Sequence, residues 1–262
     1  MISITILSIW ENFLKKSLES INSQTYDNYE IIVVNRTGDK KISYLTEEFG
    51  GKEIKAKGES FLQSRYLGAL ESKGSYVFQL EDTKSLLRND ALDILNNQKA
   101  DAIIINQIQD EKTFINKATN IYNSYYFNEI GYSLEIILPR YYKREILLYG
   151  LTVVKEKLGD LFNYIAAPDD RLIYIEAKRK IKNMYLEKRP LIIHYGDYTL
   201  KNIIKKYYYY GKSEALLLNT EYRKYTGVNF FERFRNIRSQ KNLYYFILGN
   251  SISVIRGIQF FL

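Results

Sequence analysis

The 262-residue sequence contains no cysteine, only three prolines and two methionines, and a single histidine. Without cysteine there is no disulfide framework and no thiol chemistry. The chain also lacks a P-loop and a Rossmann glycine fingerprint, so nothing in it supports simple ATP hydrolysis or hydride transfer. The composition, with little Cys and Met and much Ile, Lys and Tyr, is typical of proteins from hot habitats. We therefore expect a thermophile source.

A secretory signal is also lacking. The segment Met1–Ile9 is apolar, but it is too short for a signal peptide and has no basic start. We therefore expect a cytoplasmic protein. The length suits one large domain, or one domain with an extension, and a hydrophobic content of 46% is enough for a packed core.

The net charge of +8 is concentrated in one part of the chain. Residues 199–262 hold 11 Lys or Arg against 3 Asp or Glu, which leaves 27 basic and 27 acidic residues for positions 1–198. We therefore predict a neutral globular domain over 1–198 and a basic tail over 199–262. Such a tail indicates an anionic partner, namely a membrane, a nucleic acid or an acidic substrate.

Strand and helix patterns alternate through the first half, which predicts a doubly wound α/β sheet. The region 112–164 gives no clear pattern, and the chain reads as helical after Thr199. The expected strands are Ile2–Ile9, Glu30–Val34, Ile54–Ala56, Tyr76–Leu80, Ala102–Ile105 and Leu191–Ile193. The expected helices are Asn12–Asn22, Ile42–Phe49, Phe61–Ser72, Asp90–Asn97 and Arg171–Ile181.

The apolar strand Tyr76–Leu80 runs directly into the adjacent carboxylates Glu81 and Asp82. Ligands of open α/β sheets collect at the carboxyl ends of the strands, so these two side chains are candidate ligand contacts. Hard oxygen ligands at such a place suit Mg²⁺ or Mn²⁺ with a phosphorylated substrate. The alternative is a solvated acidic turn without a ligand.

Several runs resemble family-2 glycosyltransferases with the GT-A fold. The most specific is Leu18-Glu19-Ser20-Ile21, then Gln24-Thr25-Tyr26, then Tyr29–Val34, which resembles the first helix and second strand of that family. Shorter runs in the correct order extend the resemblance to roughly residue 212: Ser64–Ala69, Gly74–Asp82, Asp169-Asp170, His194, Thr199-Leu200 and Tyr210-Gly211. The resemblance implies an α/β fold, a GT-A doubly wound mixed sheet flanked by helices, here with a C-terminal helical extension.

The chain departs from the family pattern at three places. Ser8-Ile9-Trp10-Glu11 stands where the family often carries Pro-Thr-Tyr-Asn. Asn35, followed by Arg36, replaces the Asp that usually holds the nucleotide base. The metal-binding DXD-type motif has become Glu81-Asp82-Thr83.

The resemblance also implies roles for residues, with a nucleotide-sugar as donor and Mg²⁺ or Mn²⁺ as cofactor. Asp170 is the candidate general base with Asp169 beside it, and Asp82 and Glu81 are the candidate metal ligands. The candidate donor-binding residues are Ser8, Asn35, Arg36, Arg65, Glu81 and His194. Three alternatives stay open: the aspartates cap a helix, His194 is structural, and Arg65 forms a surface ion pair.

The tail combines basic residues with apolar stripes at helical spacing, a pattern that suits the surface of a bilayer. Residues 243–262 are nearly apolar, yet their polar side chains favour an interfacial or docked helix over a transmembrane one. The alternative is a helical subdomain packed on the body or a dimer interface. The stripes are Leu200, Ile203, Ile204, Tyr207, Tyr208 and Gly211, then Phe230, Phe231, Phe234 and Ile237.

The resemblance and the tail together predict a glycosyltransferase that transfers a sugar to a glycan or lipid-linked acceptor, as a peripheral protein on the inner face of the cell membrane. The resemblance implies that the transfer inverts the anomeric centre. One rival is a catalytically silent GT-A-like binding or scaffold protein, which the altered Glu81-Asp82-Thr83 motif favours. The other rival is a nucleic-acid binder. It is disfavoured because the positive charge of the tail comes with long apolar stripes, and we expect no nucleic-acid partner.

Overall fold

The computed structural model describes residues 1–113, 116–117, 120, 127, 138–196 and 200–226. The chain forms two compact units, each assembled from segments that are distant in sequence. The first unit comprises Met1–Gln107, Pro139–Tyr164 and Ile173–Tyr195, and the second comprises Ile108–Leu138, Ile165–Leu172 and Gly196–Leu262. Each unit is described by itself below, and the division after residue 198 remains a prediction.

The first unit is built on one mixed eight-stranded sheet with the order β3-β2-β1-β4-β7-β6-β8-β5. The strands β3, β2, β1 and β4 run parallel, and β7 then pairs antiparallel with both β4 and β6. All seven residues of β1 are buried, as expected for a strand that is covered on both faces. The strands are β1 (Ile2–Ser8), β2 (Tyr29–Asn35), β3 (Lys52–Lys55), β4 (Tyr76–Glu81), β5 (Lys84–Leu86), β6 (Ala102–Gln109), β7 (Tyr141–Lys143) and β8 (Met184–His194).

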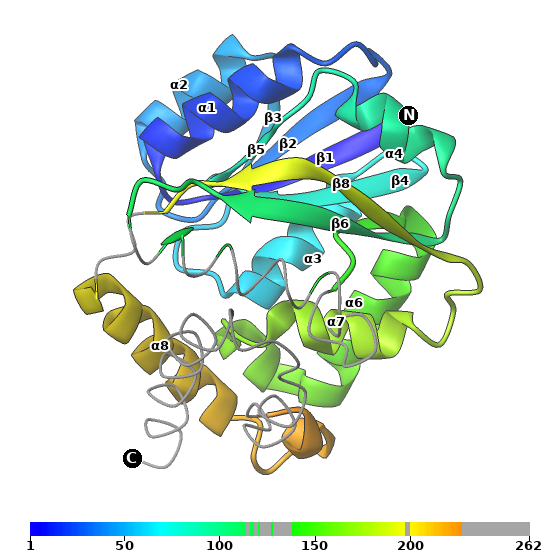
Figure 1. The fold of residues 1–262 in the computed structure, drawn as a ribbon. Helices are drawn as coiled ribbons and strands as arrows, with labels where there is room; N and C mark the ends of the chain where they lie inside the picture. Colours follow the sequence, from blue (N-terminus) through cyan, green and yellow to red (C-terminus); the bar gives the residue numbers. More distant parts are fainter. Residues whose placement is uncertain (114–115, 118–119, 121–126, 128–137, 197–199, 227–262) are drawn as a thin grey trace, which may run out of the picture. The chain divides into compact units, whose positions relative to one another are not determined.

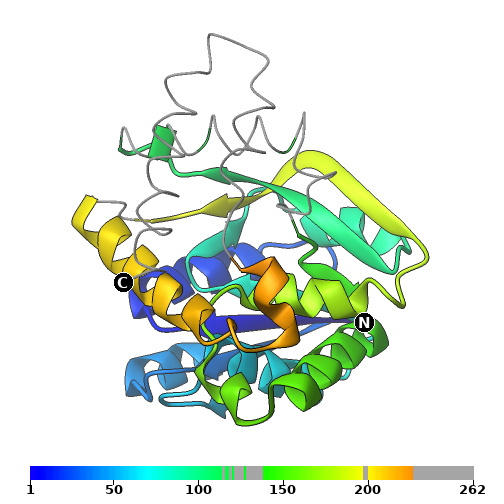
Figure 2. The same ribbon diagram turned by 90° about the horizontal axis from the view of Figure 1, so that it is seen from below.

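Helices cover both faces of this sheet, which confirms the expected α/β architecture. Figure 1 shows α1 and α2 together on one face and α3 and α6 on the other. Figure 2 shows β6 and β8 side by side, as the strand order requires. The helices are α1 (Glu11–Asn22), α2 (Lys40–Glu48), α3 (Phe61–Glu71), α4 (Ala91–Asn97), α6 (Arg144–Leu158), α7 (Asp169–Ala177) and α8 (Leu200–Ala215), with short 3-10 helices at Gly159–Tyr164 and Glu221–Tyr225.

Local side chains explain where two of these helices begin. The carboxylate of Asp39 accepts the N–H of Lys41 at 2.9 Å at the start of α2. The hydroxyl of Ser60 accepts the N–H of Gln63 at 3.0 Å at the start of α3. Such caps satisfy backbone donors that the first turn of a helix leaves unpaired.

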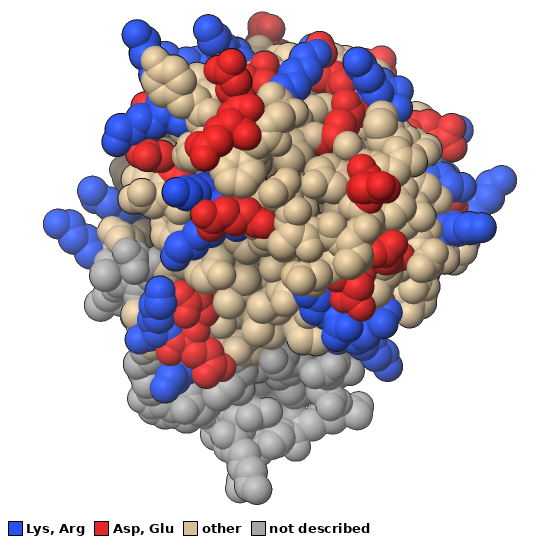
Figure 3. Space-filling view, turned by 90° about the horizontal axis from the view of Figure 1, so that it is seen from above, with Lys and Arg blue, Asp and Glu red and all other residues tan. Residues whose placement is uncertain are grey.

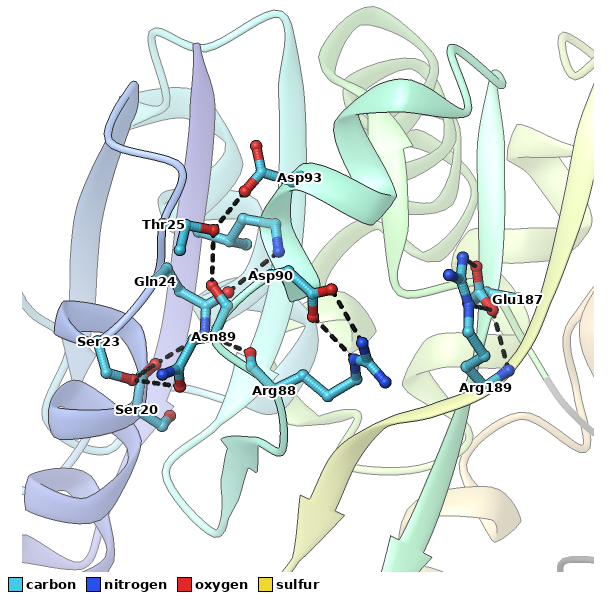
Figure 4. A network of polar contacts seen from close by, with 11 residues as sticks. Ser20, Ser23, Gln24, Thr25, Arg88, Asn89, Asp90, Asp93, Glu187 and Arg189 are labelled. Carbon is cyan, nitrogen blue, oxygen red and sulfur yellow. Dashed lines mark hydrogen bonds and ion pairs between the residues drawn. The ribbon is translucent and has the colours of Figure 1, made fainter.

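Gln24, from the run that resembles family-2 glycosyltransferases, connects α1 to α4 (Figure 4). The amide nitrogen of Gln24 donates to the carbonyl oxygens of Ser20 at 3.0 Å and Arg88 at 2.7 Å. The amide oxygen of Gln24 accepts the N–H of Leu92 at 3.1 Å, in the first turn of α4. Because Asp90 makes no side-chain cap there, Gln24 supplies the missing acceptor from a distant part of the chain.

The structure corrects several expected elements. The strand expected at Leu191–Ile193 begins at Met184, and the helix expected at Arg171–Ile181 is α7, which starts and ends earlier. Glu187, Lys188, Arg189 and Pro190 interrupt the apolar residues of β8, and the last three are exposed, which conceals a long strand from a search for apolar runs. The strands β5 and β7 have three residues each, too few for a periodic signal.

Helix α6 lies in the region where the sequence showed no clear pattern. Its buried side chains do follow helical spacing, at Ile146, Leu147, Leu151, Val154 and Leu158. The signal was therefore present in the sequence, although the aromatic residues around it obscured it. The remaining expected elements are present with bounds that differ by a few residues, as is usual for element ends.

The surface of the α1 and α2 face carries both signs of charge (Figure 3). Basic and acidic side chains are interspersed there, without a large patch of one sign. This agrees with the equal numbers of basic and acidic residues in positions 1–198. The face seen in Figure 3 therefore offers no broad basic surface for a polyanion.

The start of the tail is helical, as expected. Helix α8 spans the first apolar stripe of the tail. In the second unit the hydroxyl of Ser213 on α8 accepts the N–H groups of Ala166 at 2.8 Å and Ala167 at 3.1 Å. The second stripe and the segment 243–262 lie outside the described residues. Among the helices that are described, none is long and apolar enough to cross a bilayer.

Candidate functional site

The carboxyl ends of three parallel strands meet at one edge of the sheet in the first unit. Ser8 at the end of β1 lies opposite Asn35 at the end of β2. Leu7 lies opposite Glu81 at the end of β4, so Asp82 follows immediately beside Ser8. This edge is where ligands of open α/β sheets bind.

Asp82 connects the end of β4 to the start of α1. One carboxylate oxygen of Asp82 accepts the N–H groups of Ile9 and Trp10, both at 2.6 Å, and the hydroxyl of Ser8 at 3.2 Å. Trp10 provides no cap for α1 itself, so Asp82 satisfies donors at that helix start. Burial raises the pKa of the Asp82 carboxyl to about 6, and the accepted hydrogen bonds oppose the rise.

Glu81 lies at the centre of a cluster of three basic side chains. One of its carboxylate oxygens accepts from the guanidinium of Arg65 at 2.7 Å and from that of Arg140 at 3.1 Å. The other oxygen contacts the ammonium group of Lys84. Arg65 and Lys84 expose only 2% and 4% of their side chains, whereas Arg140 and Glu81 each expose 18%. The cluster is therefore a mostly buried ion network with one basic member at its surface.

The backbone holds each basic member of this cluster in place. Arg140 lies just before β7, where its N–H donates to Ile103 of β6 and its carbonyl accepts from Gln79 of β4. Arg65 comes from the middle of α3. Lys84 is the first residue of β5 and lies opposite His194 on β8. The single histidine is thus a cross-strand neighbour of Lys84, at the margin of the cluster.

Asn35 organises the loop after β2. Its side-chain oxygen accepts the N–H groups of Thr37 at 3.2 Å and Gly38 at 2.9 Å. Its side-chain nitrogen donates to Asp39 at 3.0 Å and Glu53 at 2.7 Å. Because Asn35 is fully buried, its role at this edge is to shape the backbone of the loop.

Arg36, the next residue, lies at the surface of the same edge. Its guanidinium donates to the carbonyl oxygen of Glu59 and lies 4.0 Å from the ring centre of Phe61. Such a stack leaves the arginine ordered in a position next to the strand ends.

The predicted donor-binding residues all belong to the first unit. They are Ser8, Asn35, Arg36, Arg65, Glu81 and His194.

Asp169 and Asp170 form the first turn of α7 and belong to the second unit. Both are half-buried. Acidic side chains in the first turn of a helix stabilise its N-terminus. The capping alternative and the general-base alternative therefore both remain for this pair.

The sequence did not identify Lys84 or Arg140 as members of the site. For Lys84 a signal existed, since it follows the acidic pair closely and is well placed to neutralise Glu81. For Arg140 no local signal exists, because 59 positions separate it from Glu81. Only the pairing of β7 with β4 and β6 brings it to this edge.

The carboxylates at this edge do not match the usual surroundings of a divalent cation. Such an ion prefers several ionised oxygen ligands with open coordination positions. Here both oxygens of Glu81 contact cationic groups, and one oxygen of the buried Asp82 already accepts three hydrogen bonds. Within the described part of the chain, no three Asp, Glu or His side chains are grouped so that they could hold a metal ion.

Solved glycosyltransferase structures resemble this fold. S. aureus TarS 1-349 in complex with UDP matches with a TM-score of 0.55 and 12% identity, over 84% of this chain and 66% of that chain. TarS 1-349 without a named ligand matches with a TM-score of 0.54 and 10% identity, over 97% of this chain and 80% of that chain. The mannosyltransferase PcManGT from Pyrobaculum calidifontis, in complex with GDP-Man and Mn²⁺, matches with a TM-score of 0.52 and 9% identity. The match covers 99% of this chain and 71% of that chain.

These identities are low, so the likeness establishes the fold, a GT-A-like sheet flanked by helices. The chain spans just under two thirds of the length of the UDP-bound TarS structure. A comparison with protein-family models found no match, and neither did a comparison with curated proteins.

Proposed function

We propose that this chain is a glycosyltransferase that moves a sugar from a nucleotide-sugar to an acceptor hydroxyl. The observation that carries the proposal is the meeting of Ser8, Asn35 and Glu81 at the carboxyl edge of a GT-A-like sheet. Proteins that share this fold have been solved with UDP, UDP-GlcNAc and GDP-Man, which supports a nucleotide-sugar as the donor here.

The reaction requires a base and a site that stabilises negative charge. The acceptor oxygen attacks the anomeric carbon, and the bond from that carbon to the diphosphate breaks, with its electron pair going to the diphosphate oxygen. The acceptor proton goes to the carboxylate of Asp170, with Asp169 as its neighbour in the first turn of α7. Attack opposite the leaving group inverts the anomeric centre, as the family resemblance implies.

The acceptor in this proposal is a glycan or a lipid-linked molecule at the cytoplasmic face of the membrane. The support is the basic tail, where 11 Lys or Arg stand against 3 Asp or Glu over residues 199–262. Aromatic stripes accompany this charge, so apolar and electrostatic attraction to an anionic surface would act together. The exposed rings of Tyr208 and Tyr209 on α8 agree with such a contact.

Calorimetry with UDP, GDP and TDP, and with a sugar derivative of each, tests the donor assignment. We expect one nucleotide to bind with a dissociation constant between about 1 μM and 1 mM, the usual range for substrates. The family resemblance implies Mg²⁺ or Mn²⁺, and PcManGT contains Mn²⁺, so each titration is made with and without Mn²⁺. Failure of every nucleotide to bind under both conditions would refute the proposal.

A matched control uses the exposed ion pair of Arg88 with Asp90, beside the end of α1 (Figure 4). Helix α1 starts at the carboxyl edge and has 12 residues, so its far end lies about 18 Å from that edge. Arg88→Ala should therefore leave nucleotide binding unchanged. A loss in this variant would show that binding reports overall stability and not the site.

A second function is favoured by the same cluster. Because Glu81 is already neutralised by basic groups and Thr83 replaces an acidic residue of the motif, the chain could bind a nucleotide-sugar without transferring the sugar. Donor hydrolysis, measured as release of the nucleoside diphosphate, separates the two functions. Binding without hydrolysis or transfer to any of a panel of acceptors would favour the silent protein.

A further inference from the structure

We infer that Asp82 is a positioning residue of the proposed donor site, which holds the loop after β1 in place and does not serve as a metal ligand. The inference rests on the proposed function and concerns the same carboxyl edge of the sheet. It gives the buried member of the acidic motif a role in nucleotide binding that acts through Ser8, Ile9 and Trp10.

Asp82 holds the end of β1 with both its backbone and its side chain. Its N–H donates to the carbonyl oxygen of Leu7 at 3.0 Å, which extends the contact of β4 with β1. A single carboxylate oxygen then accepts from three consecutive residues, namely the hydroxyl of Ser8 and the N–H groups of Ile9 and Trp10. Hydrogen bonds to an ionised oxygen are among the strongest in proteins. The turn from β1 into α1 therefore depends on this one side chain.

On its other side, the loop after β1 is joined to the end of β2. The carbonyl oxygen of Ser8 accepts the N–H of Arg36 at 3.0 Å, so Ser8 is bonded to the ends of both neighbouring strands. Strand β1 lies between β2 and β4 in the sheet. Because ligands of open α/β sheets bind at this edge, a donor there meets the loop after β1 and depends on its shape.

Burial assigns different tasks to the two ends of this contact. Asp82 is 2% exposed, whereas Trp10, whose N–H it accepts, is 56% exposed. A buried carboxylate oxygen with three donors has little room for the further oxygen ligands that a divalent cation requires. Asp82 therefore acts on a ligand through the backbone that it fixes, and this backbone carries the exposed indole of Trp10.

The first test needs no ligand, because Trp10 is the single tryptophan of the full chain. Its fluorescence is excited at wavelengths where the 25 tyrosines do not absorb, and the anisotropy reports how freely the indole moves. We expect Asp82→Ala to lower the anisotropy, and Ser8→Ala to lower it less, since it removes one hydrogen bond of three. Unchanged anisotropy and emission in a folded Asp82→Ala would overturn the inference and leave the proposed glycosyltransferase function intact.

The second test measures nucleotide binding by calorimetry with UDP and GDP. Asp82→Ala should weaken binding of the nucleotide that the unaltered chain binds by about tenfold or more, because the donor must then order the loop itself. Asp82→Asn should recover part of this loss, since an amide oxygen still accepts from Ile9 and Trp10. Equal affinity of Asp82→Ala and the unaltered chain would overturn the inference, whereas no binding by the unaltered chain would refute the proposed function itself.

A comparison at two metal concentrations separates positioning from metal binding. Each titration is made at high and at low Mn²⁺, and the Asp82 variants should lose affinity by the same factor at both. A metal ligand behaves differently, because a high concentration of the ion compensates for a weakened site. A much larger loss at low Mn²⁺ would identify Asp82 as a metal ligand and overturn the inference.

Asp101→Ala is the matched control for a general loss of stability. The carboxylate of Asp101 also accepts two backbone N–H groups, from Lys182 and Asn183. It precedes β6, which runs in the same direction as β4, so it lies at the opposite edge of the sheet. The anisotropy of Trp10 and the nucleotide affinity should therefore be unchanged in Asp101→Ala. Losses equal to those of Asp82→Ala would overturn the inference.

Discussion

The side-chain oxygen of Gln24, at the end of α1, accepts the backbone N–H of Leu92, at the start of α4, across 68 positions of sequence. The same amide donates two hydrogen bonds, to Ser20 and Arg88. One side chain therefore satisfies a carbonyl group in the last turn of α1 and an N–H group in the first turn of α4 (Figure 4). This contact lies at the far end of α1 from the candidate site, and it gives the most family-like run of the sequence a structural role.

Gln24→Ala should lower the free energy of unfolding by about 2 kcal/mol, because it leaves the Leu92 N–H and two carbonyl groups without these partners. Gln24→Glu should lower it by less, since a carboxylate can still accept from Leu92. Urea denaturation measures both. Lys15→Ala, at an exposed position of α1, is the control and should change stability by less than about 0.5 kcal/mol. Equal stability of Gln24→Ala and the parent chain would contradict this account.

Asp101 should make stability depend on pH in the acid range. The side chain of Lys143, together with the N–H groups of Lys182 and Asn183, lowers the pKa of the Asp101 carboxyl to about 2. A lowered pKa in the folded state contributes stability above the unfolded value, near pH 4, and this contribution is lost as the pH falls through about 2.

Asp101→Asn should therefore destabilise the chain at pH 7 by about 1 kcal/mol, a discounted value because water screens the half-exposed Lys143. The difference from the parent chain should shrink as the pH falls from about 4 to about 2. Unfolding at a series of pH values measures it. Lys143→Met should remove part of the same effect, and additive losses in the double variant would argue against the ion pair.

Asp170→Asn should retain nucleotide binding but slow sugar transfer by about 10²- to 10⁴-fold, the usual contribution of a general base. Asp169→Asn is the matched comparison, because it removes the same charge from the same turn of α7. Rates are measured with a saturating donor. If both variants only lower the melting temperature and transfer is unchanged, the pair caps α7 and the base lies elsewhere.

Truncation after Thr226 should weaken binding to anionic vesicles. It removes 5 Lys or Arg and 1 Glu with the second aromatic stripe, but it keeps α8 and the contacts of Ser213. Each basic residue near an anionic surface contributes about 1 kcal/mol, and salt weakens this attraction. Cosedimentation of both chains with anionic and neutral vesicles, at low and high salt, measures it. A full chain that stays in the supernatant would identify the tail as a packing element.

The order of elements in the first half of the chain was predictable from the sequence, because it depends on local patterns. Runs rich in Ile, Leu and Val marked β1 and β2, and the apolar run before Glu81 marked β4. Short strands carried no such pattern, and β5 and β7 were missed for that reason. The first part of β8 was missed because the charged residues Glu187, Lys188 and Arg189 interrupt its apolar pattern.

The sequence by itself determined that Glu81 and Asp82 lie at the carboxyl edge of the sheet, since a buried strand leads directly into them. Only the tertiary structure decided what these carboxylates contact. Arg65 arrives from α3 and Arg140 from the segment before β7, and both are far from Glu81 in sequence. The surroundings of a carboxylate depend on all the groups that the fold brings together, so the acidic motif of the sequence became a site where Glu81 contacts three basic side chains.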